Sequence, residues 1–153
     1  MEMNTIEELK ERVILIGVSV SDGDDTEESL KELKELADTA GAETVGTVIQ
    51  KREAVHPGTY IGKGKIEEVR AMAFGLDATG VICDDELSPA QLNNLEQELD
   101  LKVMDRTLII LDIFAAHART SEGKIQVELA QLKYRQARLV GLRNSLSLLG
   151  GGI

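Results

Sequence analysis

Hydrophobic residues in the first two-thirds of the chain alternate between short continuous runs and helical spacing. Residues 12–20 form a nearly continuous apolar run, which is typical of a strand buried on both faces of a sheet. Residues 44–50, 80–83 and 101–104 give three further strand patterns, and leucines or alanines three or four residues apart predict helices between them. Strands that alternate with helices predict an α/β fold, a small four-stranded parallel sheet with flanking helices.

The ends of these helices carry capping signals. They are Ser88, Pro89 and Gln91 at the start of the third helix, and Asp25 with Glu28 at the start of the first. Gly41 is expected to end the first helix, because glycine readily adopts the left-handed conformation that follows many helices. The second helix is expected over residues 65–74, with Gly75 as its end.

The strand pattern does not return after Asp105. Thr107 is expected to cap a helix that carries Leu108, Leu111 and Phe114. A break near residues 121–123 separates it from a longer helix, whose expected apolar stripe is Ile125, Leu129, Leu132, Leu139, Leu142 and Leu146. A stripe this narrow is typical of a helix that packs against another helix. We therefore divide the chain into an α/β subdomain over residues 1–105 and a long-helix subdomain over residues 106–149.

Composition excludes a disordered, secreted or membrane-spanning chain. Of the 153 residues, 42% are hydrophobic and 29% are charged, as in ordinary folded domains. No apolar run approaches the roughly 18 residues that a membrane span needs, and the acidic residues 1–12 do not resemble a secretion signal. Together with a single cysteine, Cys83, these features predict a cytoplasmic protein with no membrane partner.

The net charge of −10 conceals an asymmetry that bears on partners. Residues 1–101 carry 9 Lys or Arg and 23 Asp or Glu, whereas residues 102–153 carry 8 and 4. A basic part attached to an acidic part indicates different partners for the two. The alternative is that the basic helices merely neutralise the acidic body, and the charge alone leaves both interpretations open.

Gly62, Lys63, Gly64 and Lys65 form a segment that is a candidate phosphate site. Glycines let backbone N–H groups approach a phosphate, and a following helix N-terminus adds positive potential. The spacing matches neither Gly-x4-Gly-Lys-Ser/Thr nor Gly-x-Gly-x-x-Gly. We therefore favour a turn in which the glycines allow positive φ or close packing.

An acidic triplet, Asp84, Asp85 and Glu86, follows the third expected strand, at the edge of a parallel sheet where ligands commonly bind. Clustered carboxylates there could hold Mg²⁺ or share a proton. No histidine lies nearby in the sequence, so we favour an exposed acidic loop before a capped helix, without a metal site. Asp105 and Arg106 are expected to form an ion pair or a cap at the next junction.

Nucleophilic catalysis has little support in the sequence, and we expect no catalytic residue. His56 and His117 are the only histidines, and neither has a neighbouring partner. Cys83 lies in an apolar strand, where a thiol is usually buried and inert.

The basic residues of the last third are the stronger functional candidates. They are Arg119, Lys124, Lys133, Arg135, Arg138 and Arg143. Several fall near one helix face, a pattern suited to contacts with phosphate groups. A solvated outer face of a helical pair, with the long stems covering apolar surface, explains the same residues equally well.

Five segments of the chain, taken together, resemble one known family. They are residues 40–48 (AGAETVGTV), 59–65 (TYIGKGK), 84–95 (DDELSPAQLNNL), 105–115 (DRTLIILDIFA) and 118–132 (ARTSEGKIQVELAQL). Residues 150–153 resemble the start of that family's glycine-rich loop. From about residue 12 onward the chain is similar to the N-terminal part of the HflX family of ribosome-associated GTPases.

The resemblance implies a small parallel α/β subdomain followed by two long antiparallel helices. In the family this region engages the large ribosomal subunit and its rRNA, and a following GTPase domain binds GTP and Mg²⁺. Some members separate ribosomal subunits under stress. The residues that the resemblance suggests for rRNA contact are Arg119, Lys124, Arg135, Arg138, Arg143, Gly150, Gly151 and Gly152.

The chain departs from the family pattern by stopping at Ile153, within the glycine-rich loop. Residues 1–153 contain no Gly-x4-Gly-Lys-Ser/Thr, so we expect GTP and Mg²⁺ to belong to a longer parent and the truncated fragment to hold no cofactor. One alternative is an ATP-binding or ATP-hydrolysing site at Gly62–Lys65, with Asp84 and Asp85 holding Mg²⁺. Another is a regulatory role in restraining the parent's GTPase domain. The unpaired leucine stripe also predicts self-association of the truncated helices.

Overall fold

Four parallel strands form the sheet that the hydrophobic pattern predicts. The computed structural model describes residues 10–149, with the side chains of residues 10–134 and 136. Within them the strands are β1 (Arg12–Ser19), β2 (Glu43–Lys51), β3 (Gly80–Cys83) and β4 (Lys102–Asp105), in the order β2-β1-β3-β4. Every pairing between these strands is parallel. The predicted α/β class is confirmed.

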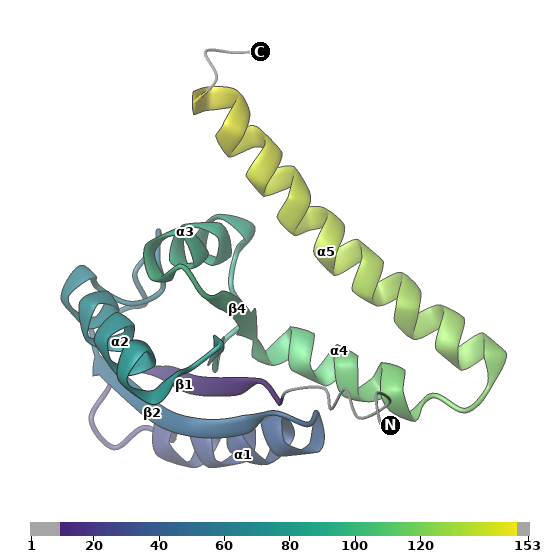
Figure 1. Ribbon diagram of the computed structural model, residues 1–153, viewed down its shortest axis with the longest axis horizontal. Helices are drawn as coiled ribbons and strands as arrows, with labels where there is room; N and C mark the ends of the chain where they lie inside the picture. The colour runs from purple at the N-terminus through teal and green to yellow at the C-terminus, as the bar shows by residue number, and fades with distance from the viewer. Residues whose placement is uncertain (1–9, 150–153) are drawn as a thin grey trace, which may run out of the picture.

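Helices cover both faces of this sheet. They are α1 (Thr26–Thr39), α2 (Lys63–Leu76), α3 (Pro89–Leu99), α4 (Arg106–His117) and α5 (Ser121–Leu149). α1 and α4 contribute to the hydrophobic layer on one face, and α2 and α3 to the layer on the other (Figure 1). Each of these four helices buries apolar residues against the sheet, so the fold has two separate hydrophobic layers.

Strand β1 lies between β2 and β3 and supplies both layers. Val13 and Leu15 belong to the layer under α1, whereas Ile14 and Ile16 belong to the layer under α2 and α3, and all four are fully buried. Successive side chains of a strand point to opposite faces, so a strand covered on both sides must be apolar throughout. The continuous run in the sequence therefore predicted this position correctly.

The start of α3 is the predicted capping box. Ser88 Oγ accepts the Gln91 N–H at 3.1 Å, and Gln91 Oε1 accepts the Ser88 N–H at 3.0 Å. Pro89 occupies the first helical position, where its missing N–H leaves no helical bond unmade.

The predicted cap of α1 at Asp25 is wrong. The Asp25 side chain makes no capping hydrogen bond, and its backbone (φ −91°, ψ 20°) is not the extended conformation typical of an N-cap. Asp24 holds this end of the helix instead, because its Oδ1 accepts the N–H and the hydroxyl of Thr26 at 3.2 and 2.8 Å. The Thr26 hydroxyl is the main cause that lowers the pKa of Asp24 from 3.8 to about 2.

The predicted end of α1 is confirmed. Gly41 follows the helix with a φ of +89°, and its N–H donates to the Asp38 carbonyl at 2.9 Å. The Ala42 N–H donates to the Ala37 carbonyl, also at 2.9 Å. These two bonds satisfy carbonyls of the last turn, and the left-handed backbone they require favours glycine.

Helix α2 is longer than predicted at both ends. It begins at Lys63 rather than Lys65 and passes through Gly75 to Leu76. Asp77 then takes the left-handed conformation, with a φ of 54°, and its N–H closes the helix end. Gly75 therefore lies inside the helix, because the left-handed position falls on the aspartate.

The cap of the first C-terminal helix lies two residues before its predicted position. Asp105, not Thr107, caps α4: its backbone is extended (φ −130°, ψ 175°) and its Oδ1 accepts the Leu108 N–H at 3.0 Å. Thr107 lies inside the first turn. Its hydroxyl donates instead to Glu86 Oε1 at 3.0 Å.

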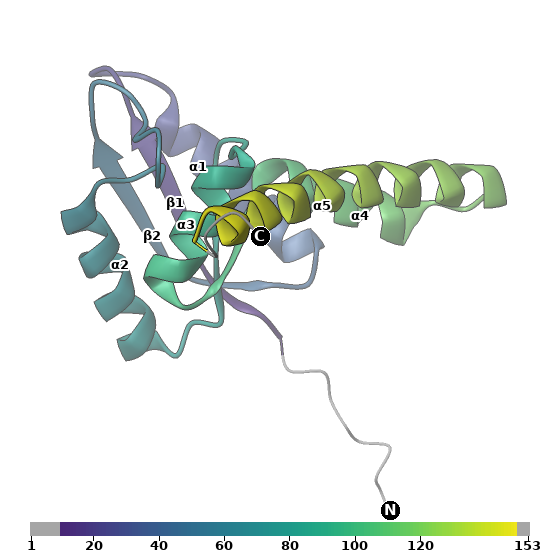
Figure 2. The ribbon, with the colours of Figure 1, turned by 90° about the horizontal axis from the view of Figure 1, so that it is seen from above.

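The break between the last two helices falls at residues 118–120, slightly before its predicted place. Thr120 Oγ1 accepts the Gly123 N–H at 2.9 Å, so Gly123 belongs to the first turn of α5. From Ser121 the chain runs as one helix to Leu149 and returns past α4 and α3 (Figures 1 and 2). α4 and α5 thus form the predicted helical pair. The division into subdomains at residue 105 stays a prediction.

Helix α5 has 29 residues, enough to cross a bilayer if it were apolar. Within residues 10–149, however, no helix combines that length with the hydrophobicity that a membrane crossing requires. Residues 150–153, predicted to begin a glycine-rich loop, lie outside the described residues.

Candidate functional site

The carboxyl ends of β1 and β3 are where a ligand is first expected. The strand order reverses there, and ligands of open α/β sheets commonly bind at such a crevice. Here Arg106 of α4 spans the place: its Nη2 donates to Asp84 Oδ1 at 2.7 Å and to the Ser29 carbonyl at 2.8 Å. The chain's own side chains therefore join the end of β3 to α1 and α4.

The other two residues of the acidic triplet are also bonded within the chain. Asp85 Oδ2 accepts the Tyr60 hydroxyl at 2.6 Å, and Glu86 Oε1 accepts the Thr107 hydroxyl. Among the described residues, no group of three or more His, Cys, Asp and Glu side chains is placed to hold a metal ion. The triplet connects its loop to neighbouring elements, with one oxygen of each carboxylate accepting a hydrogen bond from another part of the chain.

A further carboxylate, Asp105, is completely buried where β4 meets α4. Its Oδ2 accepts the Leu87 N–H at 2.9 Å and the hydroxyl of Tyr134 from α5, while its Oδ1 caps α4 at Leu108. A buried carboxylate needs such donors, because an unpaired buried charge is strongly unfavourable. Two roles were expected for Asp105 and Arg106. The cap is confirmed, since Asp105 caps α4. Arg106 forms its ion pair with Asp84 of the acidic triplet rather than with Asp105.

The segment between β2 and α2 is held by side chains of α3. Gln91 Nε2 donates to the His56 carbonyl and Asn94 Nδ2 donates to the Gly58 carbonyl, both at 2.9 Å. His56 Nδ1 accepts the N–H groups of Gly58 and Thr59 at 3.0 and 3.1 Å. His56 therefore stabilises its own turn.

Tyr60, in the same segment, has an uncommon backbone conformation. Its φ is 69°, which is unfavourable for a residue with a bulky side chain. The side chain is almost fully buried, and burial, followed by the bond to Asp85, raises the pKa of its hydroxyl far above the ordinary value. Packing and the hydroxyl bond together hold the residue in this conformation.

Cys83 is the last residue of β3 and is fully buried. Burial is the main cause that raises the pKa of its thiol well above the ordinary value, and nearby carboxylates add to the effect. A thiol that stays protonated is a weak nucleophile, in agreement with the interpretation of this apolar strand.

The glycine- and lysine-rich segment forms the start of a helix rather than the turn that we favoured. Gly62 is the N-cap of α2, and its N–H donates to Gln50 Oε1 at 2.8 Å. A Cβ at Gly62 would lie 2.6 Å from a guanidinium nitrogen of Arg52, so close packing explains this glycine. Lys65 pairs with Glu68 at 2.7 Å.

Neither reason applies to Gly64. Its φ is not positive, and a Cβ there would meet nothing within 4 Å. Glycine in a helix is less favourable than alanine by up to about 1 kcal/mol. Neither packing nor backbone conformation therefore explains why glycine stands at this position. Lys63 is exposed beside it and forms no ion pair within the described part of the chain.

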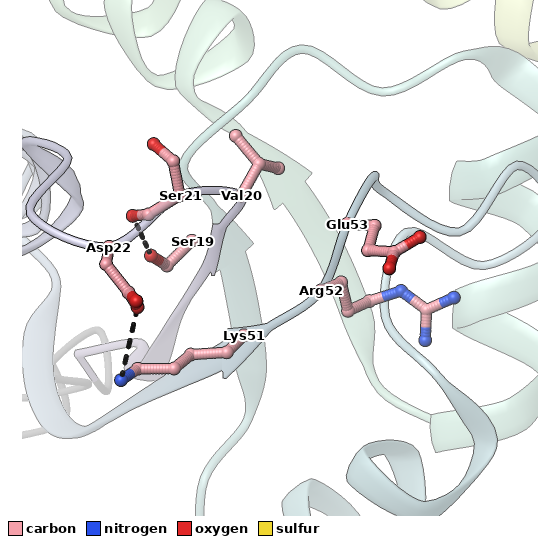
Figure 3. Close-up of a pocket in the computed structure, with 7 residues that line it drawn as sticks. All are labelled: Ser19, Val20, Ser21, Asp22, Lys51, Arg52 and Glu53. Carbon is pink, nitrogen blue, oxygen red and sulfur yellow. Dashed lines mark hydrogen bonds and ion pairs between the residues drawn. The ribbon is translucent and has the colours of Figure 1, made fainter.

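A shallow pocket lies at the carboxyl ends of β1 and β2 (Figure 3). It measures about 450 Å³, and its charged lining side chains have both signs. Lys51 and Asp22, at 4.0 Å, are almost wholly exposed, so the pair is weak. Figure 3 shows Arg52 and Glu53 on the side away from the serines of the β1–α1 loop. These side chains do not converge on a shared point.

Exposed basic side chains gather on the α4–α5 connection and α5. Arg119, Lys124 and Lys133 are exposed, and within the described part of the chain none of them forms an ion pair. The backbone of α5 carries three more arginines, whose side chains lie outside the described residues: Arg135, Arg138 and Arg143. Gly150, Gly151 and Gly152 lie outside them altogether.

Most basic residues of the α/β part, by contrast, have an acidic partner within 4.0 Å. They are Arg12, Lys31, Lys51, Lys65, Arg70 and Lys102. Pairing neutralises their charge locally, whereas the basic residues after α4 keep theirs available for a phosphate.

The face of α5 that meets the rest of the chain is not the predicted leucine stripe. The half-buried residues of α5 are Gly123, Val127, Ala130, Gln131 and Tyr134, at helical spacing. Ile125, Leu129 and Leu132 lie on the opposite side and are 63%, 51% and 62% exposed. Small and polar residues let α5 approach α4, and the most apolar side is left in solvent.

Two family models together cover most of the chain. Residues 27–115 match the family described as GTP-binding GTPase N-terminal, and residues 117–153 match GTP-binding GTPase Middle Region. A GTPase HflX from Lacrimispora saccharolytica is 66% identical over 152 residues, which is 99% of this chain and 36% of that protein. The chain belongs to the HflX family.

HflX relatives are much longer than this chain. The GTPase HflX of Escherichia coli is 41% identical over 143 residues, covering 94% of this chain but 33% of the relative. The chain thus spans about a third of the length of the HflX proteins it matches.

A solved structure shares the fold of this HflX chain. It is the crystal structure of a GTP-binding protein from the hyperthermophilic archaeon Sulfolobus solfataricus in complex with GDP. The TM-score is 0.61 at 25% sequence identity, over 92% of this chain and 44% of that one. The likeness therefore extends well beyond the sheet.

The cap at Asp105 was among the roles predicted for this HflX chain, but the bonds of the same carboxylate to Leu87 and Tyr134 were not predicted. Tyr134 is the only aromatic residue of α5, and its place on the small-residue face was a usable signal. The conformation of Tyr60 had no signal in the sequence.

Proposed function

We propose that this chain is the ribosome-engaging N-terminal region of an HflX-type GTPase and binds the large ribosomal subunit through rRNA phosphates. The observation that carries the proposal is a set of exposed basic side chains that have no acidic partner among the described residues: Arg119, Lys124 and Lys133. The proposed contacts continue along α5 and into the glycines: Arg135, Arg138, Arg143, Gly150, Gly151 and Gly152. A ribosomal partner implies a cytoplasmic location.

The charge distribution supports binding at one end of the molecule. Residues 1–101 carry a large excess of acidic residues, and the α4–α5 connection projects away from the sheet (Figure 1). RNA phosphates are repelled by the acidic body and attracted to the basic helical pair. Binding then releases counterions from the RNA, which favours the complex at low salt.

The test is binding of the 153-residue chain to purified large subunits, measured by cosedimentation. We expect the triple variant Arg119→Gln, Lys124→Gln and Lys133→Gln to bind at least tenfold more weakly, since each lost phosphate contact removes part of a sequence-independent attraction. Small subunits serve as the comparison partner.

The matched control removes the same charge from the acidic body. Lys31→Gln, Lys51→Gln and Lys102→Gln replace lysines that pair with acidic side chains. The proposal expects binding to be unchanged or slightly weaker in this variant. An equal loss in both triple variants, or no binding by the wild-type chain at low salt, would contradict the proposal.

We place GTP, Mg²⁺ and GTP hydrolysis in the part of the parent that lies beyond these residues. Residues 1–153 contain no phosphate loop of the Gly-x4-Gly-Lys-Ser/Thr kind, and the relatives carry about twice as much further sequence. The parent's own GTPase domain is then the second partner of this region. Comparing GTP turnover by the parent with and without residues 1–153 tests whether the region also restrains that domain.

A nucleotide site at the start of α2 is the second candidate. Gly64 favours it, because its open surroundings leave room for a ligand beside Lys63 at a helix N-terminus. Engagement of Gly62 and Lys65 within the chain weighs against it. Micromolar ATP binding in titration calorimetry that is lost in Lys63→Ala would support the site. The control is Lys34→Ala on α1. The absence of any heat of binding at millimolar ATP would rule the site out.

A further inference from the structure

The contacts that hold α5 to the rest of the chain include two side-chain hydrogen bonds. The Tyr134 hydroxyl donates to the buried Asp105, and Gln131 Nε2 donates to Asp112 Oδ1 at 2.8 Å. The three large apolar side chains of α5 that the structure places in solvent lie on the other side of the helix. These two polar contacts join the first half of α5 to α4 and to the end of β4.

The bond between Tyr134 and Asp105 is the more important of the two, because Asp105 also bonds other elements of the fold. The same carboxylate accepts the Leu87 N–H before α3 and the Leu108 N–H at the start of α4. The Tyr134 ring also packs on the hydrophobic layer that α1 and α4 form with the sheet. One tyrosine thus connects α5 to the end of β4, the β3–α3 loop and α4.

Among the described side chains of α5, residues 121–134 and 136, the rest of this interface contributes little apolar area, and the backbone of α5 also passes close to α3. Its other half-buried members at helical spacing are Gly123, Val127 and Ala130, whose side chains are small or absent. The connection at residues 118–120 is short, and Ala118 leaves α4 in an extended conformation. Apolar stabilisation grows with buried area, so an interface of this composition relies on its hydrogen bonds.

We propose that Tyr134 is a positioning residue, whose bond to Asp105 fixes the direction of α5 and so the place where its basic residues are presented to RNA. The part concerning RNA rests on the function proposed above. Without the bond, α5 samples other directions about residues 118–120, and only a fraction of molecules has the binding-competent arrangement. The apparent affinity falls by that fraction.

Tyr134→Phe tests the proposal, because it removes the hydroxyl and keeps the ring. Tyr60→Phe is a matched control, since it removes a tyrosine–aspartate bond in which no residue of α5 takes part. Hydrogen exchange and the distance between spin labels at Lys34→Cys and Gln136→Cys measure the direction of α5. Both label sites are exposed, whereas the native Cys83 is buried.

In Tyr134→Phe we expect exchange of amides 124–134 to rise about tenfold and the label distances to broaden, because a hydrogen bond to a buried charge is lost. Amides of β1 and α1 should keep their protection, which shows that the α/β part remains folded. In Tyr60→Phe the change should be confined to the segment between β2 and α2. Binding to large subunits should weaken about tenfold in Tyr134→Phe alone.

Unchanged exchange and distances in Tyr134→Phe would overturn the proposal. A loosened α5 with undiminished ribosome binding would overturn the positioning role as well. Absence of binding by the wild-type chain would contradict the proposed function, while the exchange and distance measurements would still decide whether Tyr134 holds α5.

Discussion

At the residue scale, Asp105, Arg106 and Thr107 connect most of the molecule within three consecutive positions. Asp105 bonds Tyr134 of α5, Arg106 bonds Asp84 and α1, and Thr107 bonds the end of the acidic triplet. Buried polar groups of this kind are stabilising when all are satisfied and strongly destabilising when one partner is removed. The acidic triplet is thus tied to the junction between the sheet and the helical pair.

Asp84→Asn should lower the free energy of unfolding by about 2 kcal/mol, because it removes the closer and more buried of the two carboxylates paired with Arg106 and leaves only Glu32, at 3.8 Å. The control Lys31→Gln removes an exposed pair with Glu28 and should change it by less than about 1 kcal/mol. Urea unfolding followed by circular dichroism measures both. Changes of similar size in the two variants would contradict a stabilising role for the Asp84–Arg106 pair.

Asp24 gives a pH-dependent prediction. Its pKa is lowered from 3.8 to about 2 in the folded chain, chiefly by the Thr26 hydroxyl. A carboxyl group with a lowered folded pKa stabilises the fold above its unfolded pKa and loses that contribution as the pH falls through the folded value. The stability difference between wild type and Asp24→Asn should therefore be constant from pH 5 to 7. Below about pH 4 the stability difference should shrink. Urea unfolding at a series of pH values from 2 to 7 measures it, and a difference that stays constant to the lowest pH would contradict this role of Asp24.

At the element scale, strands and helices were predictable where one physical requirement dominates. β1 must be apolar throughout because it is covered on both faces, and the box at Ser88 combines three agreeing signals. Asp25 and Thr107 were wrong because several polar residues precede each helix, and the local backbone decides which side chain reaches the first N–H groups: Asp105 is extended, whereas Asp25 is not. The face of α5 was wrong because leucines mark its most apolar side, whereas close approach to α4 selects small residues.

Capping gives a paired prediction at this scale. Ser88→Ala should destabilise the fold by about 1 kcal/mol, because it removes the bond to Gln91 N–H. Asp25→Ala should be nearly neutral, since that side chain makes no capping bond. Thermal unfolding of the two variants compares them directly. A larger loss in Asp25→Ala would reverse the assignment.

The exposed side of α5 gives a further prediction. Leu129→Gln should change the free energy of unfolding by less than about 1 kcal/mol, because surface substitutions have small effects. Leu33→Ala, in the fully buried layer under α1, should cost about 3 kcal/mol. Sedimentation over a concentration series tests the predicted self-association, which Leu129→Gln should weaken. A concentration-independent monomer in the wild type would contradict that association.

At the scale of the whole molecule, charge is divided unevenly between the acidic first two-thirds of the chain and the basic last third. The α/β part is acidic and pairs most of its basic side chains, whereas Arg119, Lys124 and Lys133 on the helical pair form no ion pair with any described residue. The asymmetry was visible in the sequence, but pairing depends on contacts between residues far apart in the chain. Physical reasoning alone left RNA contact and simple neutralisation equally open, and the unpaired state of these three residues favours contact.

The most direct test of this account is the salt dependence of binding between the chain and purified large ribosomal subunits. If at least three phosphates are contacted, the logarithm of the association constant should fall linearly with the logarithm of salt concentration, with a slope steeper than about −2. The variant lacking the charges of Arg119, Lys124 and Lys133 should give a clearly shallower slope. Binding that is insensitive to salt, or a slope that these substitutions leave unchanged, would contradict the account.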